Sequence, residues 1–296
     1  MTQESSARPV VVGVDGSSAA LAAARFALEE ARARSAPLHV VTAVSWPYDG
    51  VTALPPQADV AALLRDGGRV IAQAASEALA RVAGDVDLRT CVVDGHPVDV
   101  LLEMSEGAQL IVLGSRGVGG VGGVLPGSTV SRVVARAVCP VVVLPDETDL
   151  LVRHRRSVVV GVEGRQDDSE VLSYAFAEAA RRGTDLVAVH AWQDAALEPA
   201  LRMLGPLVDW AEVRTDEERV LAEALAGWSE KEPDVVVREV VMRDRTARAL
   251  VAASMLAQLL VVGSRVRRAL GSTAHGVLHR SACPVAVVPI GRGVGQ

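Results

Sequence analysis

The chain has 296 residues, with 30 Lys+Arg against 36 Asp+Glu, and its formal net charge is −6. This acidic balance argues against a nucleic-acid-binding protein, which needs a basic surface to displace counterions from phosphates. Half of the residues are hydrophobic and 22% are charged, which is a globular composition. Lys231 is the only lysine, so a mechanism that needs a phosphate-loop or Schiff-base lysine in every domain is excluded.

Short runs of Val, Ile and Leu alternate with Ala-rich segments of helical periodicity. We expect strands near 9–14, 37–44, 86–93, 109–113 and 140–144, and helices near 17–34, 58–83, 97–106 and 127–138. Ser17 or Ser18 is a candidate N-cap, and Pro97 suits the first position of a helix. Continuous hydrophobic strands that alternate with helices predict an α/β fold, a doubly wound parallel sheet with helices on both faces.

The chain is an internal repeat. Val10–Gly16 returns as Val158–Gly164 at an offset of 148, Gln109–Arg116 returns as Gln258–Arg265 at 149, and Cys139–Val141 returns as Cys283–Val285 at 144. Three matches in one order indicate two copies of one domain. We assign residues 1–146 to a first repeat, 147–156 to a charged linker and 157–296 to a second repeat. The fall in offset places a five-residue deletion between Arg265 and Cys283.

The cysteines and the hydropathy pattern bear on the compartment. Cys91, Cys139 and Cys283 are odd in number and lack CxxC spacing, so neither a disulfide framework nor a zinc site is expected. The N-terminus, Met1–Pro9, shows no signal peptide. The longest uncharged apolar stretch, Ala249–Ser264, has 16 residues, whereas a membrane span needs ~20. We expect a soluble, cytoplasmic protein without a membrane partner.

A glycine-rich loop follows the fourth expected strand. Its glycines are Gly117, Gly119, Gly120, Gly122, Gly123 and Gly127. Such a run permits positive φ and brings several amide groups to one anion. The next segment is helical, so Gly127, Ser128 and Thr129 begin a helix whose N-terminus favours an anion by ~0.3–1 kcal/mol. The loop amides, the Ser128 hydroxyl and a metal ion would add the remaining stabilisation of a bound phosphate.

Three interpretations of this loop compete. The GxGxxG at Gly117, Gly119 and Gly122 suggests a dinucleotide site, but that fingerprint belongs after the first strand of a sheet. A P-loop is excluded because this loop contains no lysine. A surface loop without a ligand stays open as an alternative. The position after a parallel strand favours a ligand, because ligands bind at the carboxyl ends of such strands.

The spacing of Gly114, Gly117, Gly127 and Ser128 is G-2x-G-9x-G-[ST], the ATP-binding motif of the universal stress protein family. The chain resembles a tandem-domain member of that family over about 9–145 and 157–290, with supporting marks in VVVGVDGS, DGHP, LIVLGSRG and CPVVVLP. The resemblance implies two tandem Rossmann-like (HUP-type) domains, each a five-stranded parallel sheet of order 3-2-1-4-5. It also implies ATP as the ligand, accompanied by Mg²⁺.

The resemblance assigns a role to each matching position. Asp15 would face the nucleoside with Gly13 beside it, and Ala43 would offer its backbone to adenine. The ribose and phosphates would be contacted by Leu113, Gly114 and Gly117. The phosphate chain would be held by Gly127, Ser128 and Thr129. Val130 departs from the family, which usually has Ser or Thr there; Thr129 or Ser131 is a candidate substitute. For Asp15 a turn role, and for His96 a helix cap, are the alternatives to ligand contact.

The second repeat has a changed motif. Gly263 matches Gly114, Val266 matches Gly117, Gly271 and Ser272 match Gly127 and Ser128, and Glu163 replaces Asp15. Only four residues, Arg267–Leu270, stand where the first repeat has nine. A valine where φ must be positive would be strained, and a short loop cannot wrap a triphosphate in the same way. We expect a mainly structural second repeat, with altered nucleotide binding through Arg265, Arg267 and Arg268 as the alternative.

These observations predict an ATP-binding stress protein, a nucleotide-dependent sensor or regulator that acts through protein contacts. No nucleophile–base pair accompanies the loop, so we expect no catalytic residues and at most slow ATP hydrolysis. His275 and His279 have zinc-ligand spacing without a third ligand, so no metal site is expected. The alternatives are a scaffold that binds no nucleotide and a nucleotide-processing enzyme of the related α/β group.

The final strands bear on assembly. The runs VVVL (141–144) and VAVV (285–288) are apolar and should form sheet edges, which usually pair or are covered. The resemblance implies that they pair with each other and make the two repeats a pseudo-dimer within the chain. A homodimer of two chains is also expected, and the sequence does not identify a regulatory protein partner.

Overall fold

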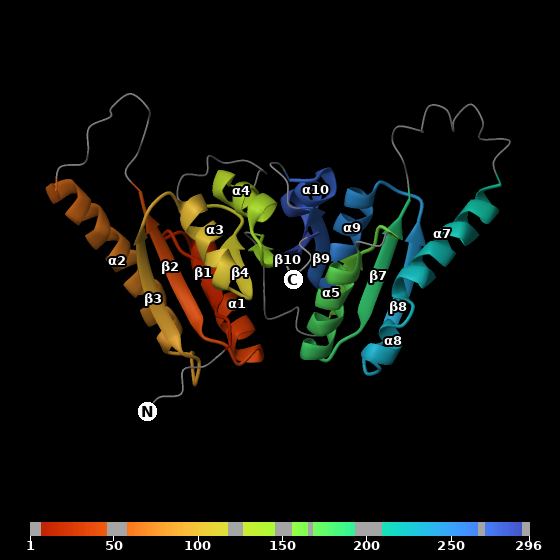
Figure 1. Cartoon of the computed structure of the whole chain (residues 1–296), viewed down its shortest axis with the longest axis horizontal. Helices are drawn as coiled ribbons and strands as arrows, with labels where there is room; N and C mark the ends of the chain where they lie inside the picture. The colour runs from red at the N-terminus through yellow and green to blue at the C-terminus, as the bar shows by residue number, and fades with distance from the viewer. Residues whose placement is uncertain are drawn as a thin grey trace, which may run out of the picture. The chain divides into compact units, whose positions relative to one another are not determined.

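The computed structural model of the chain describes residues 7–45, 58–117, 127–145, 156–164, 168–192, 209–265 and 270–291 (Figure 1). Two compact units follow each other, the first ending at Asp146 and the second beginning at Glu147. Four of the six loop glycines (119, 120, 122 and 123), and Val266, Arg267 and Arg268 of the second repeat, lie outside the described residues.

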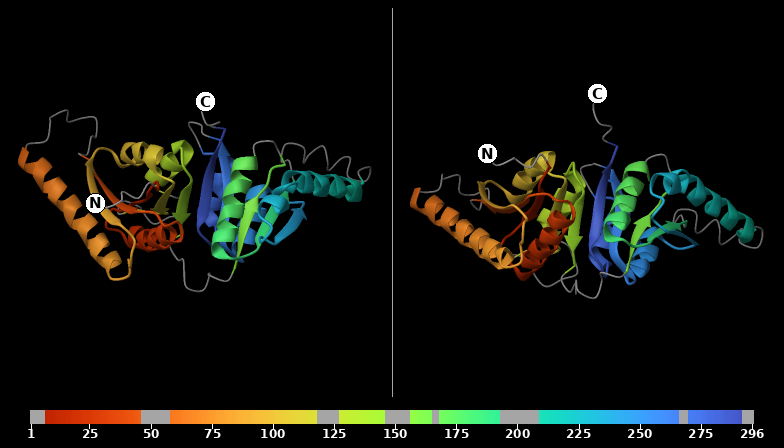
Figure 2. Two further views of the ribbon diagram at one scale, coloured as in Figure 1. Left: turned by 60° about the horizontal axis from the view of Figure 1, so that its bottom comes forward. Right: turned by 90° about the horizontal axis from the view of Figure 1, so that it is seen from below.

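The first unit alternates strands and helices. Its strands are β1 (Val10–Gly13), β2 (Leu38–Val44), β3 (Leu88–Asp94), β4 (Leu110–Gly114) and β5 (Val141–Leu144), and its helices are α1 (Ser18–Ala33), α2 (Ala58–Ala80), α3 (Pro97–Gly107) and α4 (Ser128–Arg136). All described strand pairs are parallel, in the order β3-β2-β1-β4-β5. Helices α1 and α2 pack on one face of this sheet, and α3 and α4 pack together on the other (Figure 2). The predicted fold and strand order are confirmed.

The second unit repeats this arrangement. Its strands are β6 (Ser157–Gly161), β7 (Leu186–Ala191), β8 (Val237–Met242), β9 (Ala257–Arg265) and β10 (Val285–Ile290), and its helices are α5 (Ser169–Arg182), α7 (Trp210–Leu225), α8 (Trp228–Lys231), α9 (Thr246–Ser254) and α10 (Ser272–Arg280). Its strand order, β8-β7-β6-β9-β10, reproduces that of the first unit. Both repeats therefore place the ends of equivalent strands at equivalent edges.

Local sequence signals explain where the helices begin. The Ser17 hydroxyl accepts a hydrogen bond from the Ala20 amide at 3.1 Å and caps α1. Pro97 is the first residue of α3, and Nδ1 of His96 accepts from the Val98 amide at 3.3 Å. The capping interpretation of His96 is therefore correct. Two predicted helices are longer than the observed ones, since α2 ends at Ala80 and α4 at Arg136.

The core is built from small aliphatic side chains. Val10, Val12 and Ile111 in the first sheet and Val158 and Val160 in the second have no exposed surface. Cys139 and Cys283 are buried among them, and burial raises the pKa of the Cys139 thiol to about 12. A thiol with so high a pKa stays protonated and behaves as a small apolar group. Within the described ranges, every helix is too short or too polar to span a bilayer.

Candidate functional site

The carboxyl ends of β1 and β4 meet at Asp15 and Gly117. Oδ1 of Asp15 accepts a hydrogen bond from the Ser17 amide at 3.0 Å, so the turn interpretation accounts for one carboxylate oxygen. The other oxygen lies against Gly117, where a Cβ would stand 2.3 Å from Oδ2. A side chain at residue 117 is therefore incompatible with this position of the carboxylate. The structure brings together two residues that the motif places 102 positions apart.

Two more motif glycines allow close packing beneath this edge. A Cβ on Gly114 would stand 2.7 Å from the carbonyl carbon of Ala19, because the first turn of α1 lies against the end of β4. A Cβ on Gly13 would stand 3.0 Å from Cδ2 of Leu113. These glycines, and Leu113 itself, are needed to bring α1 and the strand ends into register. Their presence in the motif has a structural reason beside any contact with a ligand.

Gly127 marks the start of α4 and differs from these glycines. Its φ is −56°, an ordinary value, and a Cβ there would meet only the Ser115 carbonyl oxygen, at 3.8 Å. The Gly127 amide donates to that oxygen at 2.9 Å, which closes the base of the loop. The N-cap residue of α4 is a glycine without a side chain to cap the helix, so within the described residues no N-cap side chain competes with an anion for the amides of the first turn. Neither backbone conformation nor packing within the described residues requires glycine here.

One expectation about the loop is wrong at the positions that can be examined. Positive φ was expected for its glycines, but neither Gly117 nor Gly127 has a positive φ. At Gly117 the reason for glycine is instead the adjacent carboxylate. The strain expected for Val266 on grounds of φ therefore loses its basis. The argument for a changed second site must rest on other residues.

The end of β2 forms the neighbouring part of the edge. The pairing of β1 with β2 ends with a hydrogen bond of 2.8 Å from the Val14 amide to the Val41 carbonyl. Among the described residues, no hydrogen bond continues this ladder from Ala43 to Val14, which leaves the Ala43 backbone available on that side. Thr42 is 3% exposed, and its buried Oγ1 has no hydrogen-bond partner within the described part of the chain. A buried hydroxyl without a partner is unusual in a folded protein.

Val130 does not take part in the candidate site at the start of α4. It is 5% exposed and packs in the core beneath α4. The hydroxyls at the start of the helix therefore belong to Ser128, which is exposed, and Thr129, which is half-buried.

The second repeat keeps the helix start of this site. Gly271 precedes α10 with φ −62° and ψ 153°, close to the −56° and 152° of Gly127. It too has no side-chain cap, and a Cβ on it would meet nothing within 4 Å among the described residues. The start of the helix is therefore alike in both repeats, whereas the loop before it has four residues in place of nine.

The opposite end, at β6 and β7, is different. His190, the counterpart of Thr42, is 6% exposed, and its Nδ1 lies 2.9 Å from the carbonyl oxygen of Val162. Its Nε2 lies 2.8 Å from Oε2 of Glu217 on α7. Val162 is the counterpart of Val14, so the imidazole contacts the end of the strand that is equivalent to β1. The second repeat thus closes this edge with its own side chains.

The matching position on α2 is a glycine, and there the helix itself covers the end of β2. Glu217 corresponds to Gly68, at the offset of 149 that also pairs Ile71 with Val220. A Cβ on Gly68 would stand 2.5 Å from Cγ2 of Val44, so the helix lies directly on the strand. Our sequence interpretation missed the His190–Glu217 pair. Aligning the two helices would have found it, because Thr and Gly become His and Glu together.

Two further contacts differ between the repeats. Glu163, the counterpart of Asp15, lies 3.5 Å from the guanidinium of Arg265. At the ends of β7 and β8, the Arg243 guanidinium lies 3.4 Å from the ring centre of Trp210, which stacks on Trp192 at 6.1 Å. In the first repeat Asp94 stands where Arg243 does, and it binds Arg65 of α2 at 2.6 Å.

The histidines of α10 pack on each other. The rings of His275 and His279 are 4.2 Å apart, in an edge-to-face arrangement. Within the described residues, no group of three or more His, Cys, Asp or Glu is placed to hold a metal ion.

Comparison with known proteins gives one consistent result. A family model described as the Universal stress protein family matches residues 6–145 and 154–289. Universal stress protein Rv2005c of Mycobacterium tuberculosis H37Rv is 38% identical over 287 residues, which cover 94% of this chain and 96% of the relative. Universal stress protein Rv2623 of the same strain is 36% identical over 294 residues, which cover 98% and 97%.

A solved structure supports the fold. The crystal structure of a universal stress protein from Archaeoglobus fulgidus DSM 4304 superposes with a TM-score of 0.70, at 17% sequence identity. The match covers 97% of this chain and 100% of that chain.

Proposed function

The chain belongs to the universal stress protein family, and we propose that its first repeat binds ATP at the carboxyl edge of its sheet while its second repeat binds no nucleotide. We further propose that the bound nucleotide regulates a stress response through protein contacts in the cytoplasm. The family relationship supports the stress-response role, and the geometry of the first repeat supports the nucleotide.

The observation that carries the proposal is the bare start of α4. Gly127 has an ordinary φ and no close neighbour for a Cβ, and the helix behind it has no capping side chain. Because neither the fold nor the packing requires glycine at this position, we infer that it leaves room for a ligand at the amides of the first turn of α4. A phosphate is the group that such amides bind best.

The remaining residues fit a nucleotide that lies along the edge from β2 to α4. The Ala43 backbone would meet the base, Asp15 the ribose, and Gly117 and Ser128 the phosphates. Gly117 lets the phosphates approach the backbone beside Asp15. A Mg²⁺ ion carried by ATP would neutralise part of the phosphate charge, next to a carboxylate that otherwise repels it.

The second repeat lacks the same base-binding edge. His190 and Glu217 are hydrogen-bonded to each other, and His190 also contacts the Val162 carbonyl. A base could enter only after this pair had been displaced. The cost would include leaving a buried histidine without its partners. We therefore propose one ATP for each chain.

A regulatory rather than catalytic role fits the same residues. The sequence of the loop contains no nucleophile–base pair, and we propose at most slow ATP hydrolysis. Pairing of β5 with β10 in an intrachain pseudo-dimer stays a prediction, as does the homodimer.

The proposal is tested on the purified full-length chain. Mass spectrometry of the denatured protein should identify co-purified ATP, and titration calorimetry with Mg-ATP after nucleotide removal should give a stoichiometry near one. The absence of both co-purified nucleotide and measurable heat would overturn ATP binding. A stoichiometry of two, with similar affinities, would contradict the closed second repeat.

A further inference from the structure

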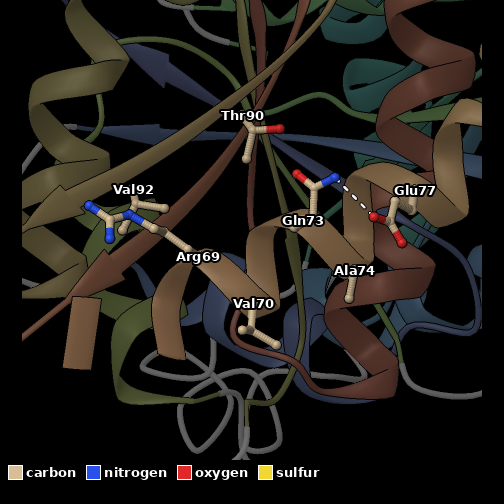
Figure 3. Close-up of a pocket in the computed structure, with 7 residues that line it drawn as sticks. All are labelled: Arg69, Val70, Gln73, Ala74, Glu77, Thr90 and Val92. Carbon is tan, nitrogen blue, oxygen red and sulfur yellow. Dashed lines mark hydrogen bonds between the residues drawn. The ribbon is translucent and has the colours of Figure 1, made fainter. Parts of the chain in front are cut away.

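A groove lies on the first repeat away from the nucleotide edge. It runs between α2 and the edge strand β3, and its volume is about 730 Å³. Val70 and Ala74 of α2 and Thr90 and Val92 of β3 line it (Figure 3). Val70 is 67% exposed and Leu63, two turns earlier on the helix, is 70% exposed. Exposed aliphatic side chains beside an edge strand can be covered by a partner.

The second repeat provides an internal control for this surface. The counterparts of Leu63, Gly67, Val70 and Ala74 on α7 are Glu212, Asp216, Arg219 and Glu223. On the edge strand, Glu239 replaces Thr90. The same fold is therefore built with a charged stripe at these positions. Since the architecture does not require an apolar stripe, its presence on α2 needs another explanation.

The charges along α2 indicate what covers the groove. Arg69 and Glu77 lie at opposite ends of the row, four residues before and four after Gln73 (Figure 3). In the single chain Arg69 pairs with Asp66 at 2.6 Å, and Glu77 accepts from Gln73 at 2.9 Å. An antiparallel α2 from a second molecule, crossing at Gln73, would bring each Arg69 against the opposite Glu77. This surface is self-complementary under a two-fold rotation.

We propose that two molecules of this protein associate through α2 and β3 of their first repeats, around a two-fold axis at Gln73. Val70 and Ala74 flank the axis and pack on the groove of the other molecule, and the two Arg69–Glu77 pairs set the antiparallel orientation. The association also covers both β3 edges. It is independent of the nucleotide, because none of these residues belongs to the proposed ATP site.

The experiment is sedimentation velocity on the full-length chain over a wide concentration range. Wild type should associate reversibly through this surface, and Val70→Arg, which introduces the residue found at this position in the second repeat, should raise the dissociation constant about tenfold or more. Arg219→Glu on α7 is the matched control and should leave association unchanged. ATP binding by calorimetry should be the same for all variants, which shows that they are folded.

A charge swap tests the two-fold arrangement itself. Arg69→Glu and Glu77→Arg should each weaken association, and the double variant should restore it, because the pairs form between molecules. A wild type that stays monomeric would overturn the proposal and leave the groove to another partner. Association that Val70→Arg does not change, or a double variant as weak as either single variant, would also overturn it.

Discussion

The two repeats share a helix start and differ at the opposite end of the same edge. Gly127 and Gly271 begin α4 and α10 with nearly equal backbone angles and no cap. At the end of the second strand, Thr42 has a buried hydroxyl without a partner, whereas His190 is bonded on both ring nitrogens. The second repeat thus keeps the helix start but differs on both sides of it, in the shorter loop before α10 and in the His190–Glu217 pair.

The scaffold beneath these edges has stayed the same. Ser105 accepts from the Val138 amide at 3.3 Å, and Ser254 accepts from the Ala282 amide at 3.0 Å, each tying the end of one helix to the segment before the last strand. Each hydroxyl also donates to a helix carbonyl at 2.6 Å. Ser105 and Ser254 therefore make equivalent contacts in the two repeats.

The largest expected effect comes from filling the space at Gly117. Gly117→Ala places a Cβ 2.3 Å from Oδ2 of Asp15, so the carboxylate or the loop must move. We expect ATP affinity to fall ~10-fold or more, which is ~1.4 kcal/mol or more. Titration calorimetry measures it. Gly107→Ala, whose Cβ would meet nothing within 4 Å, is the control, and equal affinities in the two variants would contradict the site.

The second prediction opens the closed edge. His190→Thr with Glu217→Gly gives the second repeat the residues of the first, and calorimetry with adenosine should then detect a second, weaker equivalent. The glycine should cost about 1 kcal/mol of helix stability. The control is Glu218→Gly, one residue later on α7, which should have the same cost in helix stability but should leave the His190–Glu217 pair in place. If the double variant still binds one adenosine, His190 and Glu217 are not what excludes the base.

The third prediction compares two adjacent glycines of α2. Gly67→Ala should stabilise the first repeat by about 0.5–1 kcal/mol, because a Cβ there meets nothing within 4 Å and alanine favours the helix. Gly68→Ala should destabilise it by about 1–2 kcal/mol, because its Cβ would stand 2.5 Å from Val44. Chemical denaturation measures both. A stabilising Gly68→Ala would show that α2 can move off β2, and that the base edge is less fixed than described.

The smallest expected effect is on the pH dependence of stability, through the Arg65–Asp94 pair. The hydrogen bond from Arg65 holds the pKa of Asp94 below its usual value, whereas the second repeat has the Arg243–Trp210 stack at this place. A lowered folded-state pKa means that the pair stabilises the first repeat fully above the unfolded pKa, and that this contribution is lost as the pH falls through the folded-state pKa, which lies below 3.8. Asp94→Asn should lower Tm slightly at neutral pH, and its difference from wild type should shrink as the pH falls through the folded-state pKa of Asp94. A difference in Tm that does not shrink on acidification would contradict this assignment.

Most of the fold could be predicted because the sequence patterns that specify each helix and strand are local, and because each pattern occurs in both repeats. The Val-rich strands, Ser17 and Pro97 each act within a few residues, and the repeat presents every element twice. The strand order came from the family resemblance, and the structure confirms it.

The site was less predictable because its geometry depends on contacts between distant residues. The motif indicated that Gly117 matters, but it did not reveal that Asp15, which follows another strand, lies against it. The His190–Glu217 bond joins a strand to a helix 27 residues later, and neither residue belongs to a motif. Aligning the sequence of one repeat with that of the other would have identified His190 and Glu217 as a joint change.

The aromatic cluster at the end of β7 has a consequence for spectroscopy. Trp192, Trp210 and Trp228 all belong to the second repeat, where Arg243 and Lys231 lie over indole rings, and the chain has only four tryptophans in all. Intrinsic fluorescence will therefore report chiefly on the melting of that half. Nucleotide added to the intact protein should shift a calorimetric transition while the emission trace hardly changes. The two signals together can resolve the halves without a label.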